Sequence, residues 1–90
     1  MNILYQANKI VNERSEEKDR MYGDFGTSME KTAALATLMT GKTFTAEDMY
    51  YVLVALKLSR QSFAHKEDNL LDAVAYLGAL NNYINNKNND

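Results

Sequence analysis

Apolar side chains recur at helical spacing in four stretches of the chain. The first runs from Ile3 to about Arg14, the second from about Met29 to Thr40, the third from Met49 to Leu58, and the fourth from about Glu67 to Asn82 or beyond. A spacing of three and four residues between apolar positions is typical of α-helices. We therefore predict an all-α protein, a compact bundle of about four helices.

Local signals indicate where these helices begin and end. The segments Thr27-Ser28-Met29-Glu30 and Thr45-Ala46-Glu47-Asp48 each place a hydroxyl side chain three residues before an acid, which is typical of a capping box at a helix start. Gly41 follows the second stretch and favours a helix end. The segment Met21 to Gly26 holds two glycines around Asp24 and Phe25 and predicts a turn.

The third and fourth helices are apolar almost all round. Nearly every residue from Met49 to Leu58 is apolar or aromatic, and the fourth helix repeats the pattern from Leu70 to Ile84. A helix with no polar side has to be surrounded, and three other short helices in one copy cannot enclose both. We expect a homo-oligomer, a tetramer or similar, that assembles through these C-terminal helices.

Length and composition narrow the classes of protein further. Ninety residues predict a single domain over 1–90, with a frayed, asparagine-rich tail at about 85–90. The chain has no cysteine, which excludes disulfides and thiolate metal sites. Its single histidine cannot supply a histidine cluster. A net charge of −2 provides no basic field for DNA. We also expect no leader and no membrane span, and so a cytoplasmic protein.

Polar residues on the two apolar helices are the main candidates for chemistry. Lys57 and Arg60 share one helix face, and Asn69, Asp72 and Tyr76 share another. An unpaired carboxylate at Asp72 would be costly in its apolar context, so we expect it to pair with Lys57 or Arg60. The pair could be structural, or the five residues could form a polar ligand pocket. The two cations could equally be a solvated helix end that complements the helix dipole.

The segment before the second helix adds Arg20 and Tyr22. Arginine binds phosphate bidentately, and tyrosine can stack on a nucleobase. His65, between the third and fourth helices, is interpreted as a turn residue.

An enzyme finds less support in the sequence. Helical nucleotide pyrophosphohydrolases hold magnesium with paired carboxylates three residues apart, and Glu13, Glu16 and Asp19 have this spacing. They lie in a charged run, however, and Lys57 stands where such a site would need a carboxylate. The sequence offers no candidate nucleophile, because it has no cysteine and no serine with recognisable histidine and acid partners. We predict no catalytic residue, no metal and no cofactor.

Several motifs together resemble a known family. They are Glu13-Arg14, Arg20-Met21-Tyr22-Gly23-Asp24-Phe25, Ala33-Ala34-Leu35, Thr45-x-Glu47-Asp48, Ala55-Leu56-Lys57-Leu58-Ser59-Arg60 and Asp68-Asn69-Leu70-Leu71-Asp72-x-x-x-Tyr76. In this order the motifs are similar to those of small phage-encoded all-helical proteins of formally unknown function. The resemblance covers roughly residues 13 to 80. It implies a phage gene, kinship with anti-CBASS sponge proteins, and action in the cytoplasm of the infected bacterial host.

Residues and resemblance together suggest a function. We expect a protein that binds a cyclic di- or trinucleotide second messenger of antiphage defence, such as cyclic GMP-AMP, and sequesters it uncleaved. The expected ligand-binding residues are Arg20, Tyr22, Lys57, Arg60, Asn69, Asp72 and Tyr76. The alternatives are a magnesium-dependent pyrophosphohydrolase-like enzyme and an inhibitor that binds a host protein.

Overall fold

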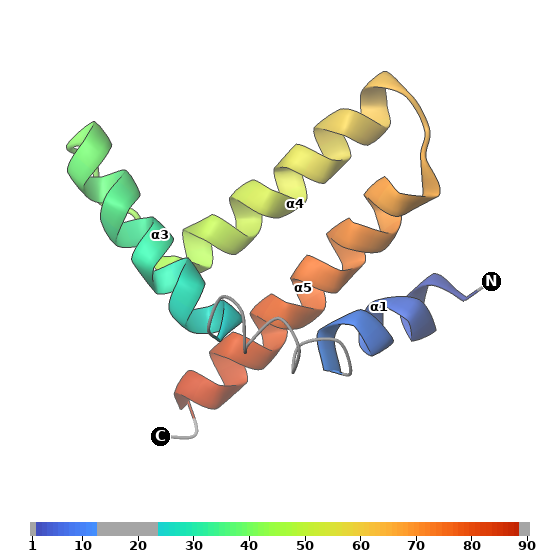
Figure 1. Cartoon of the computed structure of the whole chain (residues 1–90), viewed down its shortest axis with the longest axis horizontal. Helices are drawn as coiled ribbons and strands as arrows, with labels where there is room; N and C mark the ends of the chain where they lie inside the picture. Colours follow the sequence, from blue (N-terminus) through green and yellow to red (C-terminus); the bar gives the residue numbers. More distant parts are fainter. Residues whose placement is uncertain (1, 13–23, 89–90) are drawn as a thin grey trace.

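The computed structural model describes residues 2–12 and 24–88, and it forms four helices there (Figure 1). They are α1 (Ile3–Asn12), α3 (Phe25–Thr40), α4 (Ala46–Phe63) and α5 (Glu67–Asn88). The described residues contain no strand, so the all-α prediction is confirmed. α5 continues through Asn88, so residues 85–88, which we expected in a terminal tail, are helical.

The ends of α3 and α4 show which local signals decide a helix boundary. α4 begins with the predicted capping box: the Thr45 hydroxyl accepts from the Asp48 amide, and the Asp48 carboxylate accepts from the Thr45 amide. Gly41 ends α3 in the left-handed conformation, with φ 72°, which glycine adopts without steric cost.

The start predicted for α3 is wrong by several residues. The cap is Asp24, whose side chain accepts from the Thr27 amide at 3.2 Å. Phe25 and Gly26 therefore belong to the first helical turn and not to a loop. A side chain at Gly26 would approach the Tyr83 ring to 3.1 Å. The glycine thus permits the start of α3 to lie close to α5.

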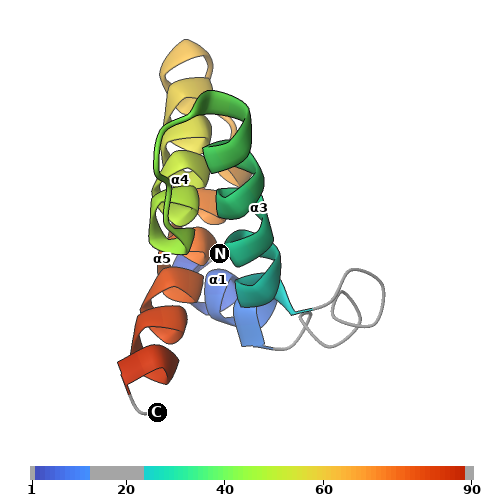
Figure 2. The same ribbon diagram turned by 90° about the vertical axis from the view of Figure 1, so that its left-hand side faces the viewer.

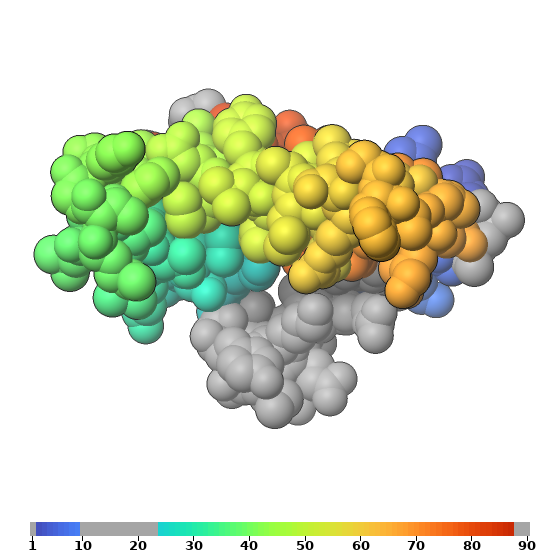
Figure 3. Space-filling view, turned by 90° about the horizontal axis from the view of Figure 1, so that it is seen from above, coloured from blue at the N-terminus to red at the C-terminus, as the bar shows by residue number. Residues whose placement is uncertain are grey.

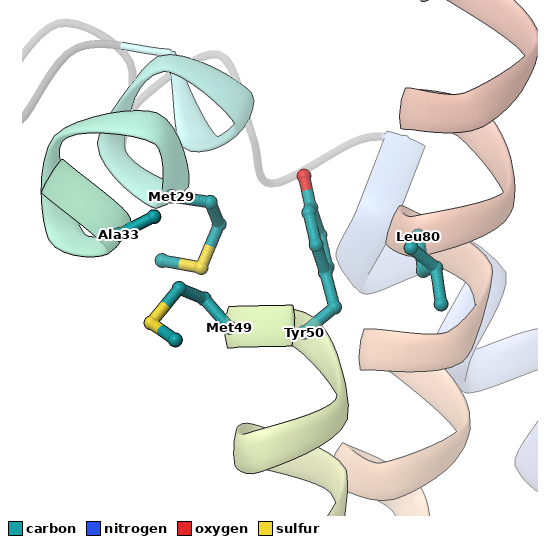
Figure 4. Packing of buried hydrophobic residues seen from close by; sticks show 5 residues of the cluster. All are labelled: Met29, Ala33, Met49, Tyr50 and Leu80. Carbon is teal, nitrogen blue, oxygen red and sulfur yellow. The ribbon is translucent and has the colours of Figure 1, made fainter. Parts of the chain in front are cut away.

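The helices pack around the hairpin formed by α4 and α5. α4 lies along α5, α3 packs against α4, and α1 packs on α5 on the side away from α4 (Figure 1 and Figure 2). The central buried cluster lies where α3, α4 and α5 meet and contains Met29, Ala33, Met49, Tyr50 and Leu80 (Figure 4). Burial of these side chains, together with the partly buried Phe25, Leu53 and Tyr83 around them, supplies the main driving force for the fold.

A single copy leaves much of its apolar surface uncovered. On α3, Leu38 and Met39 are 81% and 84% exposed. α4 runs across the middle of the face shown in Figure 3, and several of its apolar side chains also face outward. The expectation that one copy cannot cover its own helices is consistent with this surface, and self-association stays a prediction. None of the helices described is both long and apolar enough to cross a membrane.

Candidate ligand site between α4 and α5

An ion pair joins the two helices of the hairpin. The Lys57 Nζ lies 2.9 Å from the Asp72 Oδ2, and the two side chains are 17% and 35% exposed. The pairing of Asp72 across the helix interface is therefore confirmed, and Lys57 is the partner. The exposure of Asp72 leaves the carboxylate open to water on one side, which lowers the desolvation cost of the pair.

Arg60 lies one turn beyond Lys57, in the last turn of α4. Its side chain is exposed, and no carboxylate lies within 4.0 Å of it in the part of the chain that the structure describes. A cation at this position complements the negative end of the helix dipole. Its guanidinium donors also remain available for an anion.

Asn69, Asp72 and Tyr76 follow one another on successive turns of α5. Asn69 is buried, at 8% exposed, whereas Asp72 and Tyr76 are partly exposed. The Tyr76 ring stacks on Phe25 of α3, with 6.2 Å between the centroids and 15° between the planes. One face of Tyr76 is therefore already occupied by another ring. We refer to Lys57, Arg60, Asn69, Asp72 and Tyr76 as the α4–α5 site.

A chain of aromatic rings connects this site to the core. Phe25 meets Tyr50 edge-on at 5.5 Å, and Tyr50 meets Tyr83 at the same distance. The Tyr83 hydroxyl donates to Glu30 Oε2 at 3.0 Å. Our sequence analysis did not single out Tyr50 or Tyr83, and it named Glu30 only as the acid of a predicted capping box. The seven-residue spacing from Tyr76 to Tyr83, which places both on one helix face, was the available signal.

Burial raises the pKa of two of these tyrosines. For Tyr50, burial is the largest cause and the nearby Tyr83, Asp24 and Glu30 add to it, so that its pKa rises to about 12. For Tyr83, burial and then the hydrogen bond to Glu30 raise the pKa. Both rings therefore stay neutral hydrogen-bond donors at physiological pH.

The other predicted residues have different outcomes. Arg20 and Tyr22 lie outside the described residues, as do Glu13, Glu16 and Asp19. Within residues 2–12 and 24–88, no three histidine or acidic side chains are grouped as metal ligands.

His65 lies in the turn between α4 and α5, as predicted. Its Nδ1 is 2.6 Å from Gln61 Nε2, and the side-chain oxygen of Gln61, Oε1, accepts from the backbone amide of Lys66. These contacts give the Gln61–His65 pair a structural role in closing the hairpin.

The described part of the site offers binding groups of three kinds. Lys57 and Arg60 donate to anions, Asp72 accepts from N–H groups, and Tyr76 provides an aromatic ring.

A known protein family matches most of the chain. The family described as Domain of unknown function (DUF6378) matches residues 2–84. No curated protein and no solved structure gives a significant match to the chain. The match agrees with the expected family of unknown function, while phage origin and kinship with anti-CBASS proteins stay predictions.

Proposed function

The chain belongs to the DUF6378 family, a domain of unknown function, and we propose that it binds a cyclic oligonucleotide at the α4–α5 site and holds it uncleaved. The observation that carries this proposal is the Lys57–Asp72 ion pair beside the stacked rings of Tyr76 and Phe25. A cation, a carboxylate and an aromatic ring on adjacent turns match the phosphate, the base edge and the base plane of a nucleotide.

Lys57 can serve a ligand without losing Asp72. An ammonium group has three donors, and the contact with Asp72 occupies one of them. A phosphate that approaches the exposed side of the pair would accept from another donor. Asp72 would then orient the cation, and its second oxygen would accept from an amino or imino group of a base.

Arg60 supplies the second phosphate contact in this proposal. It is exposed and follows Lys57 by three residues, so both cations lie toward the same end of the hairpin. A cyclic dinucleotide has two phosphates, so two cations a turn apart suit it. Tyr76 contributes the edge of its ring and the face not covered by Phe25. Asn69 is too deeply buried to contact a ligand that stays at the surface. It would contact the ligand only if part of the ligand enters between α4 and α5.

The biological setting of the proposal comes from the motifs. We propose a phage-encoded sponge that acts in the cytoplasm of the infected bacterial host and works as a homo-oligomer. Such a protein needs affinity but no catalytic group. Arg20 and Tyr22 complete the proposed set of ligand contacts.

The test is calorimetric titration of the purified protein with a panel of cyclic di- and trinucleotides, followed by chromatography of the released ligand. We expect submicromolar binding and recovery of the ligand intact. Arg60→Ala should weaken binding about tenfold or more, because it removes a charge-assisted contact. The matched control is Lys42→Ala, which removes an exposed cation from the loop after α3 and should leave the affinity unchanged.

The other outcomes identify the alternatives. Absence of binding across the panel would refute the proposal. Magnesium-dependent turnover of nucleoside triphosphates would indicate the pyrophosphohydrolase-like enzyme, and recovery of a cleaved ligand would contradict sequestration. If neither binding nor turnover occurs, the remaining alternative is an inhibitor of a host protein, for which a pull-down from host lysate is the direct test.

A further inference from the structure

The side of α4 that faces away from α5 is apolar and uncovered. Tyr51, Val52, Leu56, Leu58 and Phe63 lie on it, and each is between 43% and 92% exposed. The helix runs along the middle of the face seen in Figure 3, from yellow-green to amber, and no other coloured segment covers it in this view. Isolated exposed apolar residues are ordinary, but several of them on the outward half of one helix mark an interaction surface.

Small uncharged residues fill the centre of the same surface. Ala55, Ser59 and Ser62 are exposed and lie at spacings of four and three, so they line up along the helix. We refer to these residues together with the five apolar ones as the outer face of α4. Between Tyr51 and Phe63 the one exposed charged residue of α4 is Arg60, at the edge of this face. A central stripe of small residues permits another helix to approach closely.

The charges at the two ends of α4 indicate what covers the outer face. Glu47 and Asp48 lie in the first turn and Arg60 in the last. A second α4 placed antiparallel would bring the acids of each copy to the arginine of the other. A parallel arrangement would instead place like charges together, which is unfavourable. The helix dipoles also favour the antiparallel arrangement.

We propose that two copies of this chain pair through the outer face of α4, antiparallel, about a two-fold axis near Ala55. A two-fold interface uses the same patch on both copies, and an uncharged patch with opposite charges at its ends is self-complementary. This inference gives a surface to the self-association proposed above. It does not require the ligand, because the Lys57–Asp72 pair lies on the side of α4 that faces α5; Arg60 borders both surfaces.

The size of the surface predicts the strength of the contact. α4 has 18 residues and is therefore about 27 Å long. A contact made by one helix pair of this length is small for a stable interface. Exchange between monomer and dimer should therefore be visible at micromolar concentration, and larger assemblies would need a second surface.

Single cysteines test the orientation cleanly, because the chain has no cysteine of its own. Ala55→Cys lies near the axis and should form a disulfide-linked dimer on mild oxidation. Ser62→Cys lies seven residues away, so in the antiparallel pair its two copies would be about 21 Å apart along the direction of the helices and beyond the reach of a disulfide. Ala34→Cys, exposed on α3, is the control for random collision. Cross-linking through Ser62→Cys as efficient as through Ala55→Cys would show a parallel pair and overturn the antiparallel one.

A charged substitution tests the surface without oxidation. Val52→Glu places two carboxylates in the proposed contact and should weaken the dimer about tenfold or more in sedimentation velocity at a series of concentrations. Leu38→Glu adds the same charge at an exposed position on α3 and should have no effect. Circular dichroism checks that both variants stay helical.

Two results would overturn the proposal in different ways. A wild-type chain that stays monomeric at high micromolar concentration would remove self-association altogether. An oligomer that persists in Val52→Glu and does not cross-link through Ala55→Cys would keep self-association and assign it to another surface. Neither result bears on the titration with cyclic nucleotides, so failure of the ligand proposal is recognised separately.

Discussion

Tyr50 shows how one residue combines packing with electrostatics. It is 1% exposed and has Phe25 and Tyr83 at 5.5 Å between ring centroids. Aromatic pairs at this separation stabilise a core beyond the effect of burial alone. The same burial disfavours the phenolate and raises the pKa of Tyr50, and the nearby Tyr83, Asp24 and Glu30 raise it further. Loss of the proton therefore reduces the stabilisation that this residue provides.

The raised pKa of Tyr50 predicts a loss of stability in alkali. An unfolded tyrosine ionises near pH 10, while the folded pKa is about 12. Below pH 10 both states keep the proton and the contribution is complete. As the pH rises from 10 toward 12, the unfolded state loses its proton first, so the free energy of unfolding falls, by about 2–3 kcal/mol at most.

Urea unfolding at pH 8 and at several values between pH 10 and 12 measures this loss. Tyr50→Phe keeps the ring without the titrating group, so it should lose less stability over the same range. An equal loss in wild type and variant would assign the effect to other groups, of which Tyr83 is the first candidate because its pKa is also raised.

At the scale of one element, α4 shows how a local signal fixes a helix end. The capping box satisfies two backbone amides at the start of the helix, those of Thr45 and Asp48. Glu47 and Asp48 then place negative charge in the first turn, where the dipole favours it. At the start of α3, the Asp24 carboxylate is the cap instead.

The cap makes a specific prediction for α4. Thr45→Ala removes the hydroxyl that accepts from the Asp48 amide and should lower the free energy of unfolding by about 1 kcal/mol. The matched control is Thr43→Ala, two residues earlier in the exposed loop, which should change stability by less than about half that amount. Urea unfolding of the two variants side by side measures the difference. Equal effects would mean that the hydroxyl of Thr45 contributes nothing as a cap.

At the scale of the whole molecule, the balance between covered and uncovered apolar surface limits the stability of a single copy. The buried cluster is small and lies at the junction of α3, α4 and α5. The outer face of α4 and the end of α3 remain open to water. A chain of this size has little stability to spare, so cover from a second copy would add substantially to it.

Association linked to folding predicts a thermal midpoint that depends on protein concentration. A tenfold increase in concentration should raise the Tm by a few degrees, because only the folded state associates. Differential scanning calorimetry at two concentrations measures the shift. In Val52→Glu the shift should be smaller, and an undiminished shift there would place the contact away from the outer face of α4.

The sequence by itself determined the features that depend on near neighbours. Apolar periodicity predicted the helices, Thr45 and Asp48 predicted the start of α4, and Gly41 predicted the end of α3, because helix hydrogen bonds and caps join residues a few positions apart. The start of α3 was misplaced because Thr27 and Asp24 are both good caps, and the approach of Tyr83 to Gly26 is not a local property.

The tertiary structure alone decided which distant side chains meet. The sequence left Lys57 and Arg60 as equal partners for Asp72, and the crossing of α4 over α5 selects Lys57. The stacking of Phe25 on Tyr76 and the hydrogen bond from Tyr83 to Glu30 join residues about fifty positions apart. Such contacts follow from how helices rotate and cross when they share a core. Periodicity shows which face of a helix is apolar, but the neighbour that this face meets depends on the packing of the whole chain.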